Sequence, residues 1–339
     1  MIAAERPTYG LDAALCAALV LLLGWGLIMV ASASVAVAEK LSGAPLYFFF
    51  KQVTYVACGL AVGGLIFAVP MKTWEQSGHG LLLFAFFLLL VVFLPGLGKS
   101  VNGAQRWLDL MVFRVQVSEP ARLALLIYLA GHIVRQQATI QNDFWGLLRP
   151  LVPLAMACVL LLAQPDFGAA AILMMVAFLM LFLGGARLLH LGGLTAALTA
   201  LAVLLVVTAA YRLRRFLSFT DPWADINNSG WQLAQSLIAI GRGEWTGVGL
   251  GNSVQKLLYL PETHTDFIFA ILAEEFGLLG IAALIALFGV VVLRGFVVAR
   301  RAETRNHRFA AYLCYGLSAW LGLQALINMA VNMGLLPTK

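Results

Sequence analysis

The feature that most constrains this chain is a series of apolar runs, most of them close to the length of a bilayer crossing. A helix needs about 20 mostly apolar residues to cross the hydrocarbon core of a membrane. Such runs predict nine membrane-spanning helices, near residues 11–33, 46–69, 79–97, 119–134, 150–163, 168–184, 190–210, 267–293 and 309–331. We therefore expect an all-α, polytopic membrane protein with a single domain over residues 1–339.

Composition excludes the other classes of protein. Hydrophobic residues make up 62% of the chain and charged residues only 11%, whereas soluble domains are about 45–50% apolar and about 25% charged. The net charge of +6 favours contact with anionic headgroups or diphosphates. No basic run with interleaved aromatic residues is present, so we expect no nucleic-acid partner.

One short segment indicates the orientation in the membrane. Residues 294–308 carry a single acid, Glu303, and five arginines: Arg294, Arg300, Arg301, Arg305 and Arg308. Positively charged loops face the cytoplasm. Counting spans back from this segment places the long stretch 211–266 on the outer, periplasmic side.

The stretch 211–266 is long for a connection, and long connections usually carry function. Within it, residues 231–240 place apolar side chains on one helical face: Trp231, Ala234, Leu237 and Ile238. This pattern predicts a helix that either lies in the headgroup plane or is buried among other helices. The sequence favours neither alternative.

A glycine-rich segment follows, from Gly241 to Gly251. Backbone amides in such a loop can bind phosphate. However, no Gly-Lys-Ser/Thr follows it and no strand pattern precedes it, so a nucleotide-binding fold is not supported. A tight turn between interfacial segments is the better interpretation.

Three ionisable residues, Glu262, His264 and Asp266, lie within five positions at the start of a predicted span. One interpretation is structural, with Thr263 or Thr265 as the helix N-cap and Asp266 stabilised by the helix dipole. The other is catalytic: a carboxylate at the membrane boundary can accept a proton from an attacking hydroxyl, with His264 as a rival base.

Two further carboxylates, Glu274 and Glu275, lie inside the following span, about 12 Å from Asp266 at 1.5 Å per residue. Ionisable groups at such depth are costly and are usually functional or paired. The sequence leaves both alternatives open.

The segment 98–118 reads as a loop that leads into another span. Ser118 is placed as an N-cap with Pro120 in the first turn, and Glu119 can pair with Arg122 three residues later. Arg106 and Trp107 precede them in the loop, and Trp is common at membrane interfaces. These residues are expected on the same outer side as Asp266.

Taken together, these segments resemble the SEDS family (shape, elongation, division and sporulation), which are polytopic peptidoglycan glycosyltransferases of bacteria. The matching stretches are Asn102-Gly-Ala-Gln-Arg-Trp107, Gln116-Val-Ser-Glu119, Gln164-Pro-Asp-Phe-Gly168, Leu260-Pro-Glu-Thr-His-Thr-Asp-Phe-Ile-Phe-Ala270 and Glu274-Glu-Phe-Gly277. Two others look like the cell-division branch of the family, namely Phe219-Thr-Asp-Pro-Trp223 and Gly247 to Pro261.

The resemblance implies a ten-helix fold, of which nine spans are found here, and polymerisation of lipid II at the septum of the bacterial inner membrane. The family's essential acid matches Asp266, its motif Trp matches Trp107 and its motif Glu matches Glu119. It also implies partnership with a class B penicillin-binding protein (a transpeptidase) and with other divisome membrane proteins. This sequence departs from the family pattern at three positions. The family has Pro where Val117 stands, Leu or Ile where Pro120 stands, and Lys where Arg122 stands.

The predicted mechanism has Asp266 as general base while undecaprenyl diphosphate leaves. Arg106, Lys256, Arg214 or Arg215 would offset the diphosphate charge, and Trp107, Glu119, Glu262 and His264 complete the predicted substrate-binding set. A divalent cation, Mg²⁺ or Mn²⁺, is compatible with this chemistry, although the sequence shows no dedicated metal cage. The alternatives are a lipid II flippase and a non-catalytic divisome scaffold.

Overall fold

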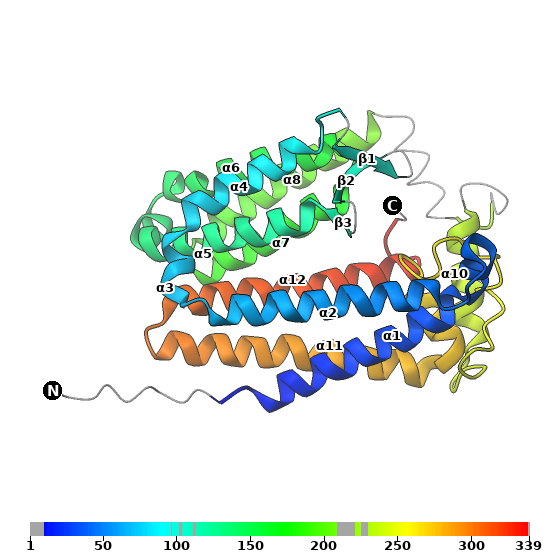
Figure 1. Cartoon of the computed structure of the whole chain (residues 1–339). Helices are drawn as coiled ribbons and strands as arrows, with labels where there is room; N and C mark the ends of the chain where they lie inside the picture. Colours follow the sequence, from blue (N-terminus) through cyan, green and yellow to red (C-terminus); the bar gives the residue numbers. More distant parts are fainter. Residues whose placement is uncertain are drawn as a thin grey trace.

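The computed structural model describes residues 10–95, 97–101, 104–110, 113–208, 221–224 and 230–337 (Figure 1). Its helices are α1 (Ala13–Ser42), α2 (Tyr47–Ala68), α3 (Met71–Gln76), α4 (Gly78–Val91), α5 (Ser118–Asn142), α6 (Phe144–Ala163), α7 (Phe167–Leu183), α8 (Leu188–Val207), α10 (Trp231–Arg242), α11 (Ile268–Thr304) and α12 (Arg308–Asn332). Three strands are also present: β1 (Gly98–Val101), β2 (Ala104–Leu110) and β3 (Phe113–Gln116).

The predicted helical membrane architecture is confirmed. Within the described ranges, five helices are long and apolar enough to cross a bilayer: α1, α2, α6, α11 and α12. Three shorter apolar helices, α4, α7 and the first part of α8, lie at further predicted spans, and α5 covers the remaining one. The number of crossings, nine, stays a prediction, as do the single domain and the boundaries of the periplasmic loop.

The molecule has two distinct ends (Figure 1). The three-stranded sheet, α10 and the C-terminal end of α12 lie at one end, whereas α3 and the turn between α11 and α12 lie at the other. The arginine-rich segment therefore lies opposite the end that carries α10, as the predicted orientation requires. Within this segment, Arg294 forms an ion pair of 2.5 Å with Asp12, which caps α1.

Two apolar clusters hold the helices together. The larger one joins α4, α5, α6, α7 and α12 through side chains that are fully buried, such as Leu125, Leu154 and Met180. The smaller one joins α1, α10 and α11 around Met29, Phe267 and Ile271. Residues 260–267 thus enter α11 beside the smaller cluster.

Helix α10 confirms the helix predicted at residues 231–240. Its side chains Leu233, Ala234 and Ala239 are buried, and the Ser236 hydroxyl donates a hydrogen bond of 2.8 Å to the Asn332 carbonyl on α12. The helix therefore packs against its neighbours, but through a face shifted from the predicted one: of the predicted apolar side chains only Ala234 is buried, Trp231 and Leu237 are half-buried, and Ile238 is exposed.

The sheet is a feature that the sequence did not predict, because residues 98–118 read as a loop. Strand β2 pairs antiparallel with both β1 and β3. Exposed ion pairs cross the strands, with the Asp109 carboxylate 3.0 Å from the Lys99 ammonium and 3.7 Å from the Arg114 guanidinium. Lys99 holds the pKa of Asp109 below its usual range. This hairpin-like sheet places Arg106 and Trp107 on β2 next to the start of α5.

Helix α11 is broken, although the sequence predicts one uninterrupted span at 267–293. Gly277 has φ 63° and ψ −160°, a conformation that is essentially restricted to glycine. The helix is therefore two segments, a short one from Ile268 and a long one that ends at Thr304.

The glycine-rich loop fills the break and satisfies its backbone groups. The amides of Val248 and Gly249 donate to the carbonyls of Glu274 and Glu275, at 3.0 and 3.1 Å. On the other side of Gly277, the amide of Leu278 donates to the Glu244 carbonyl at 2.9 Å. The amides of Val248 and Gly249 therefore donate to carbonyls of α11 within the protein. This favours the structural interpretation of the glycine-rich loop over phosphate binding.

Replacing Gly277 with alanine is expected to destabilise the fold. The added Cβ would lie 2.4 Å from the Gly247 amide nitrogen and 2.6 Å from the Gly243 carbonyl oxygen, and the backbone conformation alone costs about 1–3 kcal/mol. Thermal unfolding in detergent measures the effect. The matched control is Gly289→Ala on the same helix, where nothing lies within 4 Å of the added Cβ. Equal melting temperatures for both variants would contradict the assignment.

Candidate active site

Asp266 lies in the turn that precedes α11, and its side chain is exposed. Its backbone carbonyl accepts hydrogen bonds from the side-chain amides of Asn328 and Asn332 on α12, at 3.2 and 3.0 Å. The next residue, Phe267, is buried in the smaller apolar cluster. Among the described residues the Asp266 carboxylate has no hydrogen-bond partner. Its backbone is therefore fixed while its carboxylate stays accessible.

The predicted helix cap at this position is wrong. Helix α11 begins after Phe267, without a side-chain cap. The Thr263 hydroxyl instead donates to the Ala33 carbonyl on α1 at 3.0 Å, and the Thr265 hydroxyl donates to the Glu262 carboxylate at 2.6 Å. Each hydroxyl is used in a tertiary or local contact, so neither is available to the first turn of the helix.

His264 and Glu262 flank the same turn. The His264 ring lies against Phe48 of α2, with a centroid distance of 4.4 Å, and its buried Nδ1 has no partner among the described residues. Burial lowers the pKa of His264, the Glu262 carboxylate raises it and the Lys51 ammonium lowers it further. With an ordinary histidine pKa of about 6.5, a net lowering leaves the imidazole neutral at pH 7.

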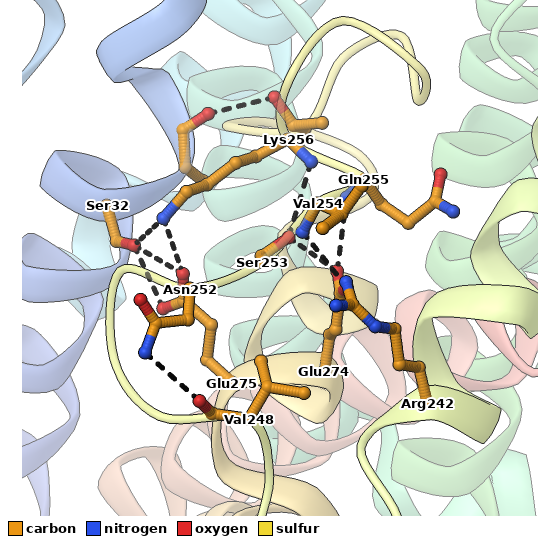
Figure 2. Close-up of polar contacts among 12 residues, drawn as sticks. Ser32, Arg242, Val248, Asn252, Ser253, Val254, Gln255, Lys256, Glu274 and Glu275 are labelled. Carbon is orange, nitrogen blue, oxygen red and sulfur yellow. Dashed lines mark hydrogen bonds and ion pairs between the residues drawn. The ribbon is translucent and has the colours of Figure 1, made fainter.

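The two buried glutamates of α11 are both paired (Figure 2). The Glu275 carboxylate lies 2.7 Å from the Lys256 ammonium and accepts a hydrogen bond of 2.6 Å from the Ser32 hydroxyl. The Glu274 carboxylate lies 2.8 Å from the Arg242 guanidinium and accepts from the Ser253 hydroxyl at 2.5 Å. Of the two alternatives for these carboxylates, the structure supports the partner-bound one.

Lys256 is therefore placed differently from the other predicted substrate contacts. Its side chain is only 9% exposed, and its ammonium donates to both Glu275 and Ser32. The charge of this lysine is already balanced inside the protein. Its predicted role as a diphosphate contact stays a prediction.

A second polar cluster brings three of the sequence motifs together. Asp166, which is 4% exposed, accepts hydrogen bonds from the Gln116 amide at 3.1 Å and from the Ser118 hydroxyl at 3.2 Å. It also caps α7 by accepting from the Ala169 amide. The Arg106 guanidinium donates to the Gln164 carbonyl at 3.0 Å and to the Pro165 carbonyl, and lies 3.9 Å from the Asp166 carboxylate.

This cluster corrects the predicted start of α5. Ser118 is the first helical residue rather than the N-cap, which is Val117 without a side-chain cap bond. The Ser118 hydroxyl is used by Asp166 instead. The predicted pair of Glu119 and Arg122 is present. Glu119 is the more exposed of the two, because Arg122 is buried against the Trp320 ring of α12, 5.0 Å from its centroid.

The predicted site residues thus fall into distinct groups. Glu262, His264 and Asp266 share one turn, and Arg106, Trp107 and Glu119 share the sheet and the start of α5, with Trp107 opposite Gln116. Both groups lie at the same end of the molecule (Figure 1). The sequence did not predict the contact of Trp320 with Arg122 or the role of Asp166 as the common acceptor. In both cases the partners are distant in sequence, so no local pattern indicates the contact. Arg214 and Arg215 lie outside the described residues.

Removal of the Asp166 carboxylate is expected to destabilise the cluster. Asp166→Ala leaves the buried Ser118 hydroxyl without its carboxylate acceptor and removes one of the two acceptors of the half-buried Gln116 side-chain amide, at a cost of about 1–3 kcal/mol. Asp109→Ala is the control, because its exposed ion pair with Lys99 contributes about 1 kcal/mol or less. Thermal unfolding in detergent compares the two, and an equal loss in both variants would refute this role.

The fold and the site together define a class of protein. Several helices are apolar and long enough to cross a bilayer. One end of the molecule carries the arginine-rich segment and the other carries the exposed Asp266. These features are those of a polytopic membrane protein with a site outside the membrane. The sequence matches the family described as "Cell cycle protein", which groups FtsW, RodA and SpoVE, over residues 13–339. The chain belongs to this family, and the resemblance drawn from its motifs is confirmed.

Individual relatives agree with this membership. The chain is 50% identical over 334 residues to the probable peptidoglycan glycosyltransferase FtsW of Thioalkalivibrio sulfidiphilus, covering 98% of this chain and 84% of that protein. It is 47% identical over 335 residues to the protein of the same name from Legionella pneumophila, covering 99% and 85%.

Solved structures show the same fold. One, titled "Structural coordination of polymerization and crosslinking by a peptidoglycan synthase complex", gives a TM-score of 0.77 at 24% identity over 97% of this chain and 89% of that chain. The rod shape determining protein RodA of Thermus thermophilus gives 0.68 at 23% identity over 96% and 86%. The protein is therefore a multi-pass membrane protein of this fold.

Proposed function

We propose that this protein is a peptidoglycan glycosyltransferase that polymerises lipid II into glycan strands, with Asp266 as the general base. The activity is the one in the names of its FtsW relatives, which align over nearly the whole chain. We place it in the bacterial inner membrane at the division septum, with its active face in the periplasm.

The observation that carries this proposal is the setting of Asp266. A general base has to reach the proton that it removes, and its carboxylate is exposed at the end of the molecule opposite the arginine-rich segment. Its backbone is held by two asparagine amides of α12. A fixed backbone with a free carboxylate suits a group that must meet a bound saccharide.

The reaction joins two prenyl-linked glycans. The 4-hydroxyl oxygen of the acceptor N-acetylglucosamine attacks the anomeric carbon of the donor, and the bond from that carbon to undecaprenyl diphosphate breaks. Asp266 takes the hydroxyl proton. Because a carboxyl has a pKa of about 4 and a sugar hydroxyl is far less acidic, proton transfer is concerted with attack. General-base assistance of this kind is typically worth about 10²–10⁴ in rate.

The leaving diphosphate needs compensating charge near the rim of the membrane. Arg106 is the best placed of the predicted contacts, since its side chain is 23% exposed beside the Asp166 cluster. Trp107, Glu119, Glu262 and His264 lie at the same end and remain the proposed saccharide contacts. Among the described residues, no group of three or more His, Cys, Asp or Glu side chains could hold a metal ion. A divalent cation, if bound, would supply further positive charge beside the leaving diphosphate, and no step here depends on it.

The proposed partners are a class B penicillin-binding protein and other divisome membrane proteins. The solved neighbour with a TM-score of 0.77 belongs, by its title, to a peptidoglycan synthase complex that coordinates polymerisation and crosslinking. A polymerase that passes its strand to a transpeptidase would use such an assembly.

The flippase alternative loses one of its supporting features. One sequence feature that favours a flippase is the presence of two acids, Glu274 and Glu275, within a predicted span, and both are paired inside the protein. The break near Gln164 is likewise occupied by the contacts of Arg106 and Asp166. No observation in the described residues favours transport or a purely docking role over polymerisation.

Replacing Asp266 with asparagine is expected to abolish polymerisation. The amide cannot accept the proton, so the rate of strand synthesis from labelled lipid II in detergent should fall by about 10²-fold or more, with the melting temperature unchanged. Gel separation of the glycan strands measures the rate, with and without the transpeptidase partner.

The control is Asp143→Asn, because Asp143 is also exposed but precedes α6 at the opposite end of the molecule. This variant should polymerise at the wild-type rate. Full polymerisation by a folded Asp266→Asn protein would reject Asp266 as the base. Lipid II transfer across liposomes without polymer formation by the wild type would instead support the flippase.

A further inference from the structure

The half-helix that begins next to Asp266 needs an anchor at its other end. The break at Gly277 separates residues 268–276 from the long segment of α11, so continuity of the helix does not fix the orientation of this short piece. Any rotation or shift of the piece would move the turn that carries Asp266.

The anchor is a buried ion pair at the end of the half-helix. Both residues are buried, with 2.7 Å between the Glu275 carboxylate and the Lys256 ammonium. The Ser32 hydroxyl of α1 bonds to both, at 2.6 Å from the carboxylate and 2.9 Å from the ammonium. Figure 2 shows the three side chains converging from α1, the loop and α11.

The same ion pair closes the stretch of chain that contains the acid. Lys256 precedes Asp266 by ten residues and Glu275 follows it by nine. Within this stretch, Thr263 is fully buried and bonds to the carbonyl of Ala33, the neighbour of Ser32 on α1. Two adjacent residues of one helix therefore hold the stretch on both sides of the turn.

Glu274, the residue before Glu275, holds the same short helical segment to the loop and to α10. Its carboxylate accepts from the backbone amides of Val254 and Gln255, at 3.0 and 3.4 Å, and it pairs with Arg242 at the end of α10. The segment that carries Lys256 is thus held to the half-helix by backbone contacts as well. Consecutive glutamates tie the half-helix to α1, to α10 and to this loop.

We propose that Lys256 and Glu275 are positioning residues for the glycosyl transfer: their buried pair sets where the Asp266 carboxylate stands, and neither touches the substrate. This inference rests on the proposed role of Asp266 and replaces the expectation that Lys256 neutralises the diphosphate. A misplacement of a reacting group by about 1 Å can cost on the order of 10²-fold in rate. A loosened anchor should therefore lower kcat and leave KM for lipid II nearly unchanged.

The test is a double-mutant cycle with Lys256→Met, Glu275→Gln and the double variant, in the lipid II polymerisation assay. Each single variant leaves one buried charged partner without its counterpart, which costs more than removing both. We expect each single variant to lose on the order of 10²-fold in kcat. The kcat of the double variant should be higher than that of Lys256→Met alone. Direct contact with the diphosphate predicts the contrary: a raised KM for Lys256→Met, no recovery in the double variant and near-normal Glu275→Gln.

The matched control is Lys99→Met, which removes a lysine from an exposed ion pair of 3.0 Å and should leave kcat and KM at wild-type values. Melting temperatures in detergent identify the variants that fold. Glu275→Gln keeps the shape of the side chain and its bond to Ser32, so it preserves the test if Lys256→Met does not fold.

The outcomes separate this inference from the proposed function. An active wild type with inactive Asp266→Asn establishes the base independently of Lys256. Wild-type kcat in folded Glu275→Gln, or a double variant no better than Lys256→Met, would overturn the positioning role while leaving the base in place.

Discussion

The break in α11 at Gly277 is the constraint on which the rest of this end of the protein depends. A broken helix inside a membrane protein exposes backbone groups that lipid cannot satisfy. Here the loop from Gly243 to Gly249 supplies them, with the amides of Val248 and Gly249 on the carbonyls of Glu274 and Glu275. The close approach requires glycine on both sides, because a Cβ on Gly247 would lie 2.1 Å from the Glu275 carbonyl oxygen. The break, the loop and the buried glutamates form one unit.

The other polar cluster solves a related problem between different elements. Asp166 accepts from Gln116 and Ser118 and caps α7, so one carboxylate joins the sheet, α5 and α7. Arg106 contacts the carbonyls of Gln164 and Pro165 from the sheet. Motifs that lie far apart in the sequence are therefore parts of a single contact network. This explains how a small, polar sheet stays attached to an apolar helical bundle.

The sequence predicted most of the helices, because apolar runs of bilayer length are specified locally. It did not predict the sheet, whose strands are short and carry polar residues such as Lys99 and Asp109, which form an exposed ion pair. It missed the break, because a glycine within an apolar run has no local sign of an unusual conformation. Thr263 was misassigned as a cap for the same reason: its hydroxyl is taken by Ala33, a residue distant in sequence. These local predictions failed because contacts with residues distant in sequence determine the structure there.

The exposed Asp266 carboxylate has no hydrogen-bond partner among the described residues, so its own side chain does not hold it in place. Its position has to come from the backbone and from neighbours. In this protein, Asn328 and Asn332 hold the Asp266 carbonyl, and the pair of Lys256 with Glu275 holds the far end of the same half-helix. The buried charges cost desolvation free energy, and their contribution is a fixed geometry. A lysine that the sequence predicts as a diphosphate contact, Lys256, can therefore serve the reaction from within the protein interior.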